Sequence, residues 1–366
     1  MLEGSCDVRL CYCLRHGLAC GFKIVNAPIL VAIAVVGAVL STDTARAQTA
    51  PFAGKTITLV VHTPPGGGYD AYGRLLSRHL GRFIEGNPHV IVANRPGAGG
   101  YVAANYAANV ALRDGTVLAL MQQSTLLDEA MGTSPMRTSV REFNWIGNIT
   151  QSNNVVAMWH TSPVKTIGDA IKRDTLVGAS GANSTAAQVP AYLNAILGTR
   201  FKVVRGYEGG AAIDIAMQRG EVEGRGSNTW ASYKSTNAAN LREGKLHFLV
   251  QVGVRREPDL PNVPLLTDLT KGDPMKEQAA RFVSLALSIS RPLAAPPGVP
   301  LERVDLLRRA FDAAMKDPQL LDEANKLSLE VEPMSGEEVQ AGIGQILATP
   351  REVIEKLRVA MSAANN

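Results

Sequence analysis

Cysteine is missing from most of this 366-residue chain. All four cysteines lie near the start, at Cys6, Cys11, Cys13 and Cys20. A disulfide framework, a thiolate nucleophile and a cysteine-ligated metal are therefore excluded from the rest of the protein. An excess of one charge is missing too, because 37 Lys and Arg face 33 Asp and Glu without a dense basic block. Such a weak, scattered excess does not support a nucleic-acid partner.

Long hydrophobic runs are also scarce, and the only one is the 14-residue run Ala27–Leu40. It follows basic residues and precedes Ala45 and Ala47, which occupy the small-residue positions of a signal-peptidase site. We therefore predict a signal peptide over residues 1–47, cleavage before Gln48 and a periplasmic protein. The alternative is a membrane anchor, but the run is shorter than the roughly 20 residues that span a bilayer.

Aromatic residues make up only 5% of the chain, but apolar residues reach 46%, enough for a sizeable core and too many for a disordered chain. Short β-branched runs predict strands at Ile57–His62, Val90–Ala93, Val117–Met121, Val155–Trp159, Leu176–Ala179, Phe201–Val204, Phe248–Val252 and Val283–Ser290. Helical periodicity separates many of them, for example over 186–197 and 211–219. This alternation predicts an α/β protein with mainly parallel sheets, followed by a helical C-terminal part.

Four glycine-rich turns each join a predicted strand to a predicted helix. Their candidate binding residues are Gly66, Gly67, Gly68, Tyr69 and Asp70 in the first turn, Gly97, Ala98 and Gly99 in the second, Ser180 and Ser184 in the third, and Tyr207 and Gly209 in the fourth. Helix N-termini carry unpaired N–H groups and partial positive charge, and glycine lets a ligand approach the backbone. Two turns in each half of the chain predict an anion, by preference a carboxylate, held between two lobes.

Signatures of enzymes and metal sites are missing. Ser180 lies in the sequence GASGA, which is not the Gly-x-Ser-x-Gly of a nucleophile elbow. No histidine pair has zinc-ligand spacing, and no turn matches a phosphate-binding loop. Asp70 fits a helix cap better than a general base. We therefore expect no catalytic residue, no metal and no cofactor.

Several motifs together resemble one known family. The stretch ITLVVHTPPGGGYDAYGRLLSRHL is followed by VIVANRPGAGGYVAANYAA, then by RDGTVLALM, GASGANS, GYEGG and PDLPNVPLLTDL, in that order. This series is similar to the solute-binding receptors of tripartite tricarboxylate transporters, the Bug or TctC family. The resemblance covers about residues 55–350, and its most specific part is NRPGAGG at Asn94–Gly100.

The resemblance implies a type II periplasmic binding-protein fold, with two α/β lobes joined by a strand hinge around a central ligand cleft. Lobe one would comprise residues 55–153 and 247–366, and lobe two residues 154–246. It further implies a small carboxylate ligand, delivery to the membrane subunits of a tripartite transporter, and a monomer. All of the twelve turn residues except Tyr69 match the family's ligand-binding loops.

Several residues near the expected cleft depart from the family pattern: Tyr69, Ala186–Val189, Arg205 with Gly206, and Glu208. Tyr69 would suit an aromatic acid, and Arg205 could hold a second anionic group or simply face solvent. Two other functions remain open. One is a periplasmic hydrolase that uses Ser180 or Asp70 in the same cleft. The other is a ligand sensor that contacts a membrane histidine kinase.

Overall fold

Two β-sheets organise the protein, whose computed structural model describes residues 50–364. The predicted signal peptide lies outside the described residues. The first sheet has the order β11-β4-β10-β3-β1-β2 and contains β1 (Thr56–Val61), β2 (His89–Asn94), β3 (Val117–Leu120), β4 (Asn144–Asn148), β10 (Pro292–Ala295) and β11 (Met334–Ser335). The second has the order β7-β6-β8-β5-β9 and contains β5 (Asn154–Trp159), β6 (Thr175–Ala179), β7 (Phe201–Arg205), β8 (Gly224–Thr229) and β9 (Leu246–Val252).

Both sheets are mixed, which differs from the mainly parallel sheets expected. β1 runs parallel to β2 and β3, and β6 runs parallel to β7 and β8. β10 pairs antiparallel with β3 and β4, and β5 pairs antiparallel with β8 and β9. β4 and β5 are joined by residues 149–153, where the chain passes from the first sheet to the second. The antiparallel pairs therefore include the strands that connect the two sheets.

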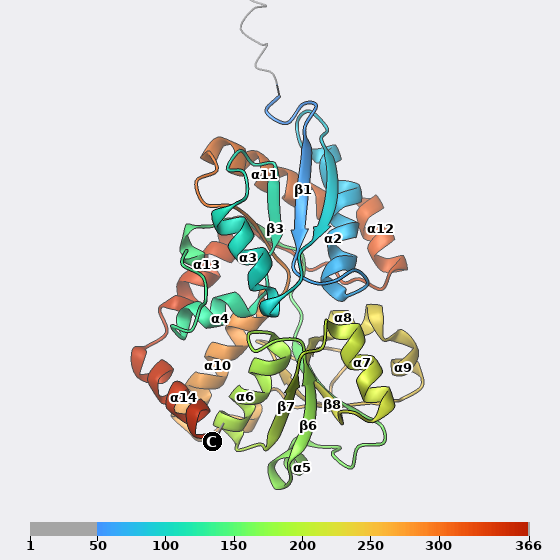
Figure 1. Ribbon diagram of the computed structural model, residues 1–366, viewed down its shortest axis with the longest axis vertical. Coiled ribbons are helices and arrows are strands. Elements are labelled where there is room, and N and C mark those ends of the chain that lie inside the picture. The colour runs from blue at the N-terminus through green and yellow to red at the C-terminus, as the bar shows by residue number, and fades with distance from the viewer. Residues whose placement is uncertain (1–49, 365–366) are drawn as a thin grey trace, which may run out of the picture. The chain divides into compact units, whose positions relative to one another are not determined.

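Helices cover both sheets (Figure 1). Lobe one combines the first sheet with α2 (Gly68–His79), α3 (Tyr101–Asn109), α4 (Ser124–Ala130), α11 (Leu301–Ala314), α12 (Pro318–Lys326) and α13 (Gly336–Leu347). Lobe two combines the second sheet with α5 (Ile167–Lys172), α6 (Thr185–Leu197), α7 (Gly210–Arg219), α8 (Trp230–Thr236) and α9 (Ala238–Arg242). The remaining helices are α10 (Pro274–Ser288) and α14 (Arg351–Ala364).

The strand predicted at Val283–Ser290 is wrong, because most of this segment is the end of helix α10. The apolar run there is short, and such a run fits a buried helix as well as a strand. The residues that indicate a helix precede this segment in the sequence. Asp273 caps the helix by accepting hydrogen bonds from the backbone N–H groups of Met275 and Lys276, and Pro274 occupies the first helical position.

The chain divides between the lobes differently from the predicted boundaries. The predicted boundaries place β9 largely in lobe one, but it pairs with β5 along its whole length and so belongs to the second sheet. The C-terminal helix α14, also assigned to lobe one, packs against α6 of lobe two. Lobe two therefore includes residues 247–252 and carries α14 on its surface.

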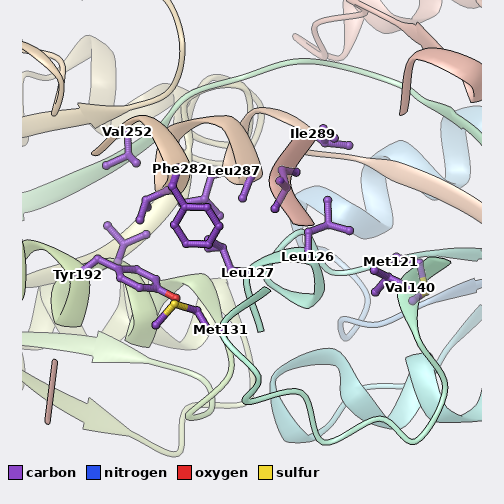
Figure 2. Close-up of a cluster of buried hydrophobic side chains, with 14 of the residues drawn as sticks. Met121, Leu126, Leu127, Met131, Val140, Tyr192, Val252, Phe282, Leu287 and Ile289 are labelled. Carbon is purple, nitrogen blue, oxygen red and sulfur yellow. The ribbon is translucent and has the colours of Figure 1, made fainter. Parts of the chain in front are cut away.

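Apolar side chains from both lobes pack together at the junction of α4, α6 and α10 (Figure 2). Leu127 comes from α4, Tyr192 from α6, and Phe282 from α10, and all three are buried. Val252 at the end of β9 lies in the same cluster. The lobes are therefore joined by an apolar contact as well as by the connecting strands.

Candidate functional site

A cavity of about 690 Å³ lies where the glycine-rich turns of the two lobes face each other. Every predicted binding residue except Asp70 lines it: Gly66, Gly67, Gly68, Tyr69, Gly97, Ala98, Gly99, Ser180, Ser184, Tyr207 and Gly209. The turns follow β1, β2, β6 and β7, which all run in the parallel part of their sheets. The carboxyl ends of parallel strands meet at one sheet edge, which explains why turns far apart in sequence share one cavity.

The turns of the two lobes touch directly. A Cβ atom on Gly99 would lie 2.7 Å from the backbone nitrogen of Ser184, and one on Gly181 would lie 2.9 Å from the nitrogen of Gly99. On another side, a Cβ on Gly209 would lie 3.4 Å from the ring of Pro64. Glycine is therefore required at the second and third turns because the backbones of the two lobes meet there without room for a side chain.

The helices that begin at these turns lack side-chain caps. Within residues 50–364, α2, α3, α6 and α7 start at Gly67, Gly100, Ser184 and Gly209 with no side chain accepting a hydrogen bond from their first amides. By contrast, α5, α10, α12 and α13 are capped by Thr166, Asp273, Asp317 and Ser335. These four helix starts border the cavity, and N–H groups in the first turn of such a helix suit an anion. At α3 the N–H groups of Gly100 and Tyr101 already donate to the carbonyls of Gly97 and Ala98. Three other helices, α4, α9 and α11, also lack a side-chain cap.

Asp70 stabilises the first turn instead of lining the cavity. Its carboxylate accepts hydrogen bonds from the Gly66 N–H at 2.9 Å, from Arg74 Nε at 2.8 Å and from Asn94 Nδ2 at 2.9 Å. Burial by itself would raise the pKa of Asp70, but these hydrogen bonds outweigh it and hold the pKa below its usual value. The residue is therefore an ionised structural group that holds two turns together through Gly66 and Asn94.

Two arginines that no sequence motif indicated also line the cavity, Arg225 on β8 and Arg291 just before β10. Neither follows a glycine-rich turn, and β8 (GRGSNT) has no apolar alternation, so no pattern marked this region as a strand. Its polar residues Ser227, Asn228 and Thr229 also line the cavity. A strand that presents polar side chains to a cavity lacks the apolar run or alternation that indicates a strand in a sequence.

Arg291 lies against the aromatic side chains of lobe one. Its guanidinium is 4.1 Å from the ring centre of Tyr69, and that ring meets His62 edge-on at 4.1 Å. The Tyr69 hydroxyl donates to the Ser290 carbonyl at 2.9 Å. Burial and the neighbouring Arg291 charge lower the pKa of His62 to about 3, so this histidine is neutral at physiological pH. One face of Tyr69 is thus occupied by Arg291.

Arg225 has a carboxylate partner. Its Nη1 lies 3.4 Å from Asp214 Oδ1, and both side chains are largely buried. Glu208 is exposed and borders the cavity. Arg205 is exposed and is not among the residues that line the cavity, so its position does not support the hypothesis that it holds a second anionic group.

A buried carboxylate links the two lobes beside the cavity. Asp128 on α4 accepts hydrogen bonds from Tyr101 of its own lobe at 2.5 Å and from Gln188 of lobe two at 2.6 Å. The Ser124 hydroxyl on the same helix donates to the Asn183 carbonyl of lobe two at 2.7 Å. Burial raises the pKa of Asp128 despite these donors. These contacts hold α4 against the start of α6.

Ser180 lines the cavity, but within residues 50–364 no hydrogen bond joins its hydroxyl to a histidine or a carboxylate. A serine nucleophile needs such a base within hydrogen-bond reach. Over the same residues, no cluster of three His, Asp or Glu side chains could hold a metal ion. No helix in the described part is long and apolar enough to cross a membrane.

Comparison with known sequences identifies the family. The profile described as tripartite tricarboxylate transporter family receptor matches residues 84–359. The chain belongs to this receptor family. A relative, the UPF0065 protein in the gbd 5′ region of Cupriavidus necator, is 27% identical to this receptor over 345 residues, which cover 92% of this chain and 97% of that protein.

Solved structures confirm the type II periplasmic binding-protein fold. Rpa4515 of R. palustris, solved with adipate, is 20% identical with a TM-score of 0.64, and the match covers 83% of this chain and 98% of that chain. MatC from Rhodopseudomonas palustris, solved with bound malate, is 20% identical with a TM-score of 0.63 over 85% of this chain and 100% of that chain. At these identities the structures establish the shared fold of two α/β lobes around a cleft.

Proposed function

We propose that this receptor is exported, captures a small organic carboxylate in the cavity between its lobes, and delivers it to a tripartite membrane transporter. The observation that carries this proposal is the set of four uncapped helix starts, two from each lobe, around one cavity. Backbone amides and helix dipoles together favour a carboxylate over a neutral group. The structural neighbours solved with adipate and malate support this choice of ligand class.

Capture and release require that the lobes separate and close. Gly99 and Ser184 meet backbone to backbone in the present arrangement, so the structure corresponds to lobes in contact. A carboxylate between the turns would be held by groups from both lobes, and it would therefore favour this closed state over an open one. The twelve predicted residues would act mainly through their backbone, except Asp70, which supports the first turn.

Binding is tested by titrating the mature protein, from Gln48 onward, with a panel of C4 to C8 dicarboxylates, matched monocarboxylates, citrate and benzoate. Calorimetry should show saturable binding to one site for at least one acid, with a rise in melting temperature. The matched diamide of the best acid has the same length without charge, and we expect no binding from it. If no acid binds, or if the diamide binds as tightly, the carboxylate assignment is wrong.

The partner is tested separately, because the same cleft would serve transport, sensing or hydrolysis. Cells that lack this protein should lose uptake of the radiolabelled acid and regain it with the intact gene. Unchanged uptake, together with lost induction of target genes, would favour the sensor. Turnover of an ester of the best acid that is abolished by Ser180→Ala would favour the hydrolase.

Export is tested by mass spectrometry of the protein recovered from the periplasm. The expected N-terminus is Gln48. Recovery of the full-length chain in the cytoplasm alone would overturn the export proposal.

A further inference from the structure

A buried arginine in the cavity has no carboxylate partner. Arg291 lines the cavity, but only 1% of its surface is exposed. Its Nη1 donates to the Ser290 carbonyl at 2.6 Å, and its Nη2 donates to the hydroxyls of Thr229 at 2.9 Å and Ser232 at 2.6 Å. A guanidinium has five N–H donors, so two are left over, and Nε is buried without a hydrogen-bond partner.

The charge of Arg291 is not neutralised by the protein. Within residues 50–364 its hydrogen-bond partners are two hydroxyls and a carbonyl, and no Asp or Glu pairs with it. The ring systems beside it are Tyr69 and Tyr72, with ring centres 4.1 and 5.1 Å from the guanidinium carbon. His62, which also borders the cavity, is neutral. Arg225, the other arginine of the cavity, differs because it pairs with Asp214.

An unpaired charge in such a place is costly. Arginine is almost never fully buried without a partner, because an isolated buried ion loses its hydration without compensation. The two tyrosine rings offset part of this cost through cation–π attraction. An anion placed against the guanidinium from the cavity side would offset the rest, because a charge-assisted hydrogen bond is stronger than a neutral one.

Arg291 lies in the part of the cavity beside the first glycine-rich turn. A Cβ on Gly68 would lie 3.4 Å from its Nη2, which places the guanidinium at the start of α2, beside the first turn. The contact between Gly99 and Ser184 joins the second and third turns. The cavity therefore offers an arginine at the first turn and uncapped helix starts at the other turns.

We propose that Arg291 determines the specificity of this receptor by binding a second carboxylate, so that dicarboxylates are preferred to monocarboxylates of the same length. The inference rests on the proposed function, since it assumes that the cleft binds a carboxylate. The inference adds to that function a side chain, Arg291, that would distinguish ligands with two carboxylates from ligands with one. The backbone amides of the glycine-rich turns would hold the other carboxylate.

The test compares adipate with hexanoate, and succinate with butyrate, by calorimetry at fixed pH and ionic strength. The wild-type protein should bind the dicarboxylate of the better pair at least tenfold more tightly than its monocarboxylate. Arg291→Gln should remove most of this preference, because it should weaken binding of the dicarboxylate several times more than binding of the monocarboxylate. Arg205→Gln makes the same change of charge at an exposed position outside the cavity and should leave the preference unchanged.

Other results would overturn the inference. Equal affinity of the wild-type protein for both members of each pair, or equal loss for both in Arg291→Gln, would show that Arg291 only holds the lobes together through Thr229 and Ser232. If Arg291→Gln does not fold, Arg291→Lys keeps the charge and should keep part of the preference; full loss in that variant also counts against the proposal. Failure of all four acids and of the wider panel to bind would instead refute the proposed function.

Discussion

Replacing Gly99 by alanine should weaken closure of the lobes, and therefore ligand binding, while the protein still folds. Gly99 has a φ of +66°, and its added Cβ would lie 2.7 Å from the Ser184 nitrogen and 2.9 Å from the Asn183 carbonyl carbon. Ordinary contact begins near 3.4 Å, so the backbone of lobe two must move by about 0.7 Å. Both neighbouring atoms belong to the backbone and cannot rotate away.

The free-energy cost of Gly99→Ala has two parts, one from the backbone conformation and one from the clash. The left-handed backbone costs an alanine about 1 kcal/mol, which lowers the melting temperature of a chain of this size by about 2 °C. The clash adds about 1–3 kcal/mol, the range for overpacking, but only while the lobes are in contact. Because we expect the ligand to bind the closed state, affinity should fall by about 5- to 150-fold.

Gly132 provides a matched control. Its φ is +65°, but an added Cβ would meet nothing within 4 Å, so Gly132→Ala carries the same backbone strain without the clash. The two variants should lose similar stability, measured by thermal unfolding without ligand. Only Gly99→Ala should lose affinity in calorimetry with the best acid of the panel. Affinities of the two variants within twofold of each other would refute the argument that these turns must meet for binding.

Three further changes test the groups around the cavity. The pKa of His62 is about 3 in the folded protein against an ordinary 6.5, so lowering the pH from 6.5 to 5 should reduce the free energy of unfolding by about 2 kcal/mol through this residue. Urea unfolding at both pH values should show a smaller decrease for His62→Gln, and equal decreases would contradict the assignment. Asp128→Ala leaves the Tyr101 hydroxyl and the Gln188 amide without an acceptor and should cost about 3 kcal/mol of stability; a loss below about 1 kcal/mol would mean that water replaces the carboxylate. Tyr69→Phe removes the hydrogen bond to the Ser290 carbonyl and should cost about 1 kcal/mol of stability without changing affinity more than twofold. A tenfold loss of affinity would show that the hydroxyl contacts the ligand.

The parts of the site built from backbone were predictable from the sequence. Glycine clusters after β-branched runs marked the turns at Gly66–Gly68 and Gly97–Gly99, and these do line one cavity. The physical reason is that a close backbone approach and a positive φ both demand glycine, which leaves a visible signature. At Gly99 the structure has both features.

The parts built from side chains were not predictable in the same way. Arg291 follows an apolar run whose pattern predicts a strand but which forms helix α10, so nothing in the local pattern indicates that Arg291 lies at the cavity. Arg225 lies on a strand whose polar residues hide its strand character. The position of both depends on how distant segments pair, such as β10 with β3 and β8 with β5, and local patterns do not encode such pairing.

Helices that begin without a side-chain cap affect how such a receptor can evolve, because their N–H groups do not depend on a particular side chain. The amides at Gly67 and Gly209 are main-chain groups, and they stay the same whatever side chains surround them. Mutation can therefore alter β8 or Arg291 without removing the groups that suit a carboxylate. Under the proposed function, a duplicated gene could therefore change which organic acid its product binds through a few substitutions, because the backbone groups would remain in place.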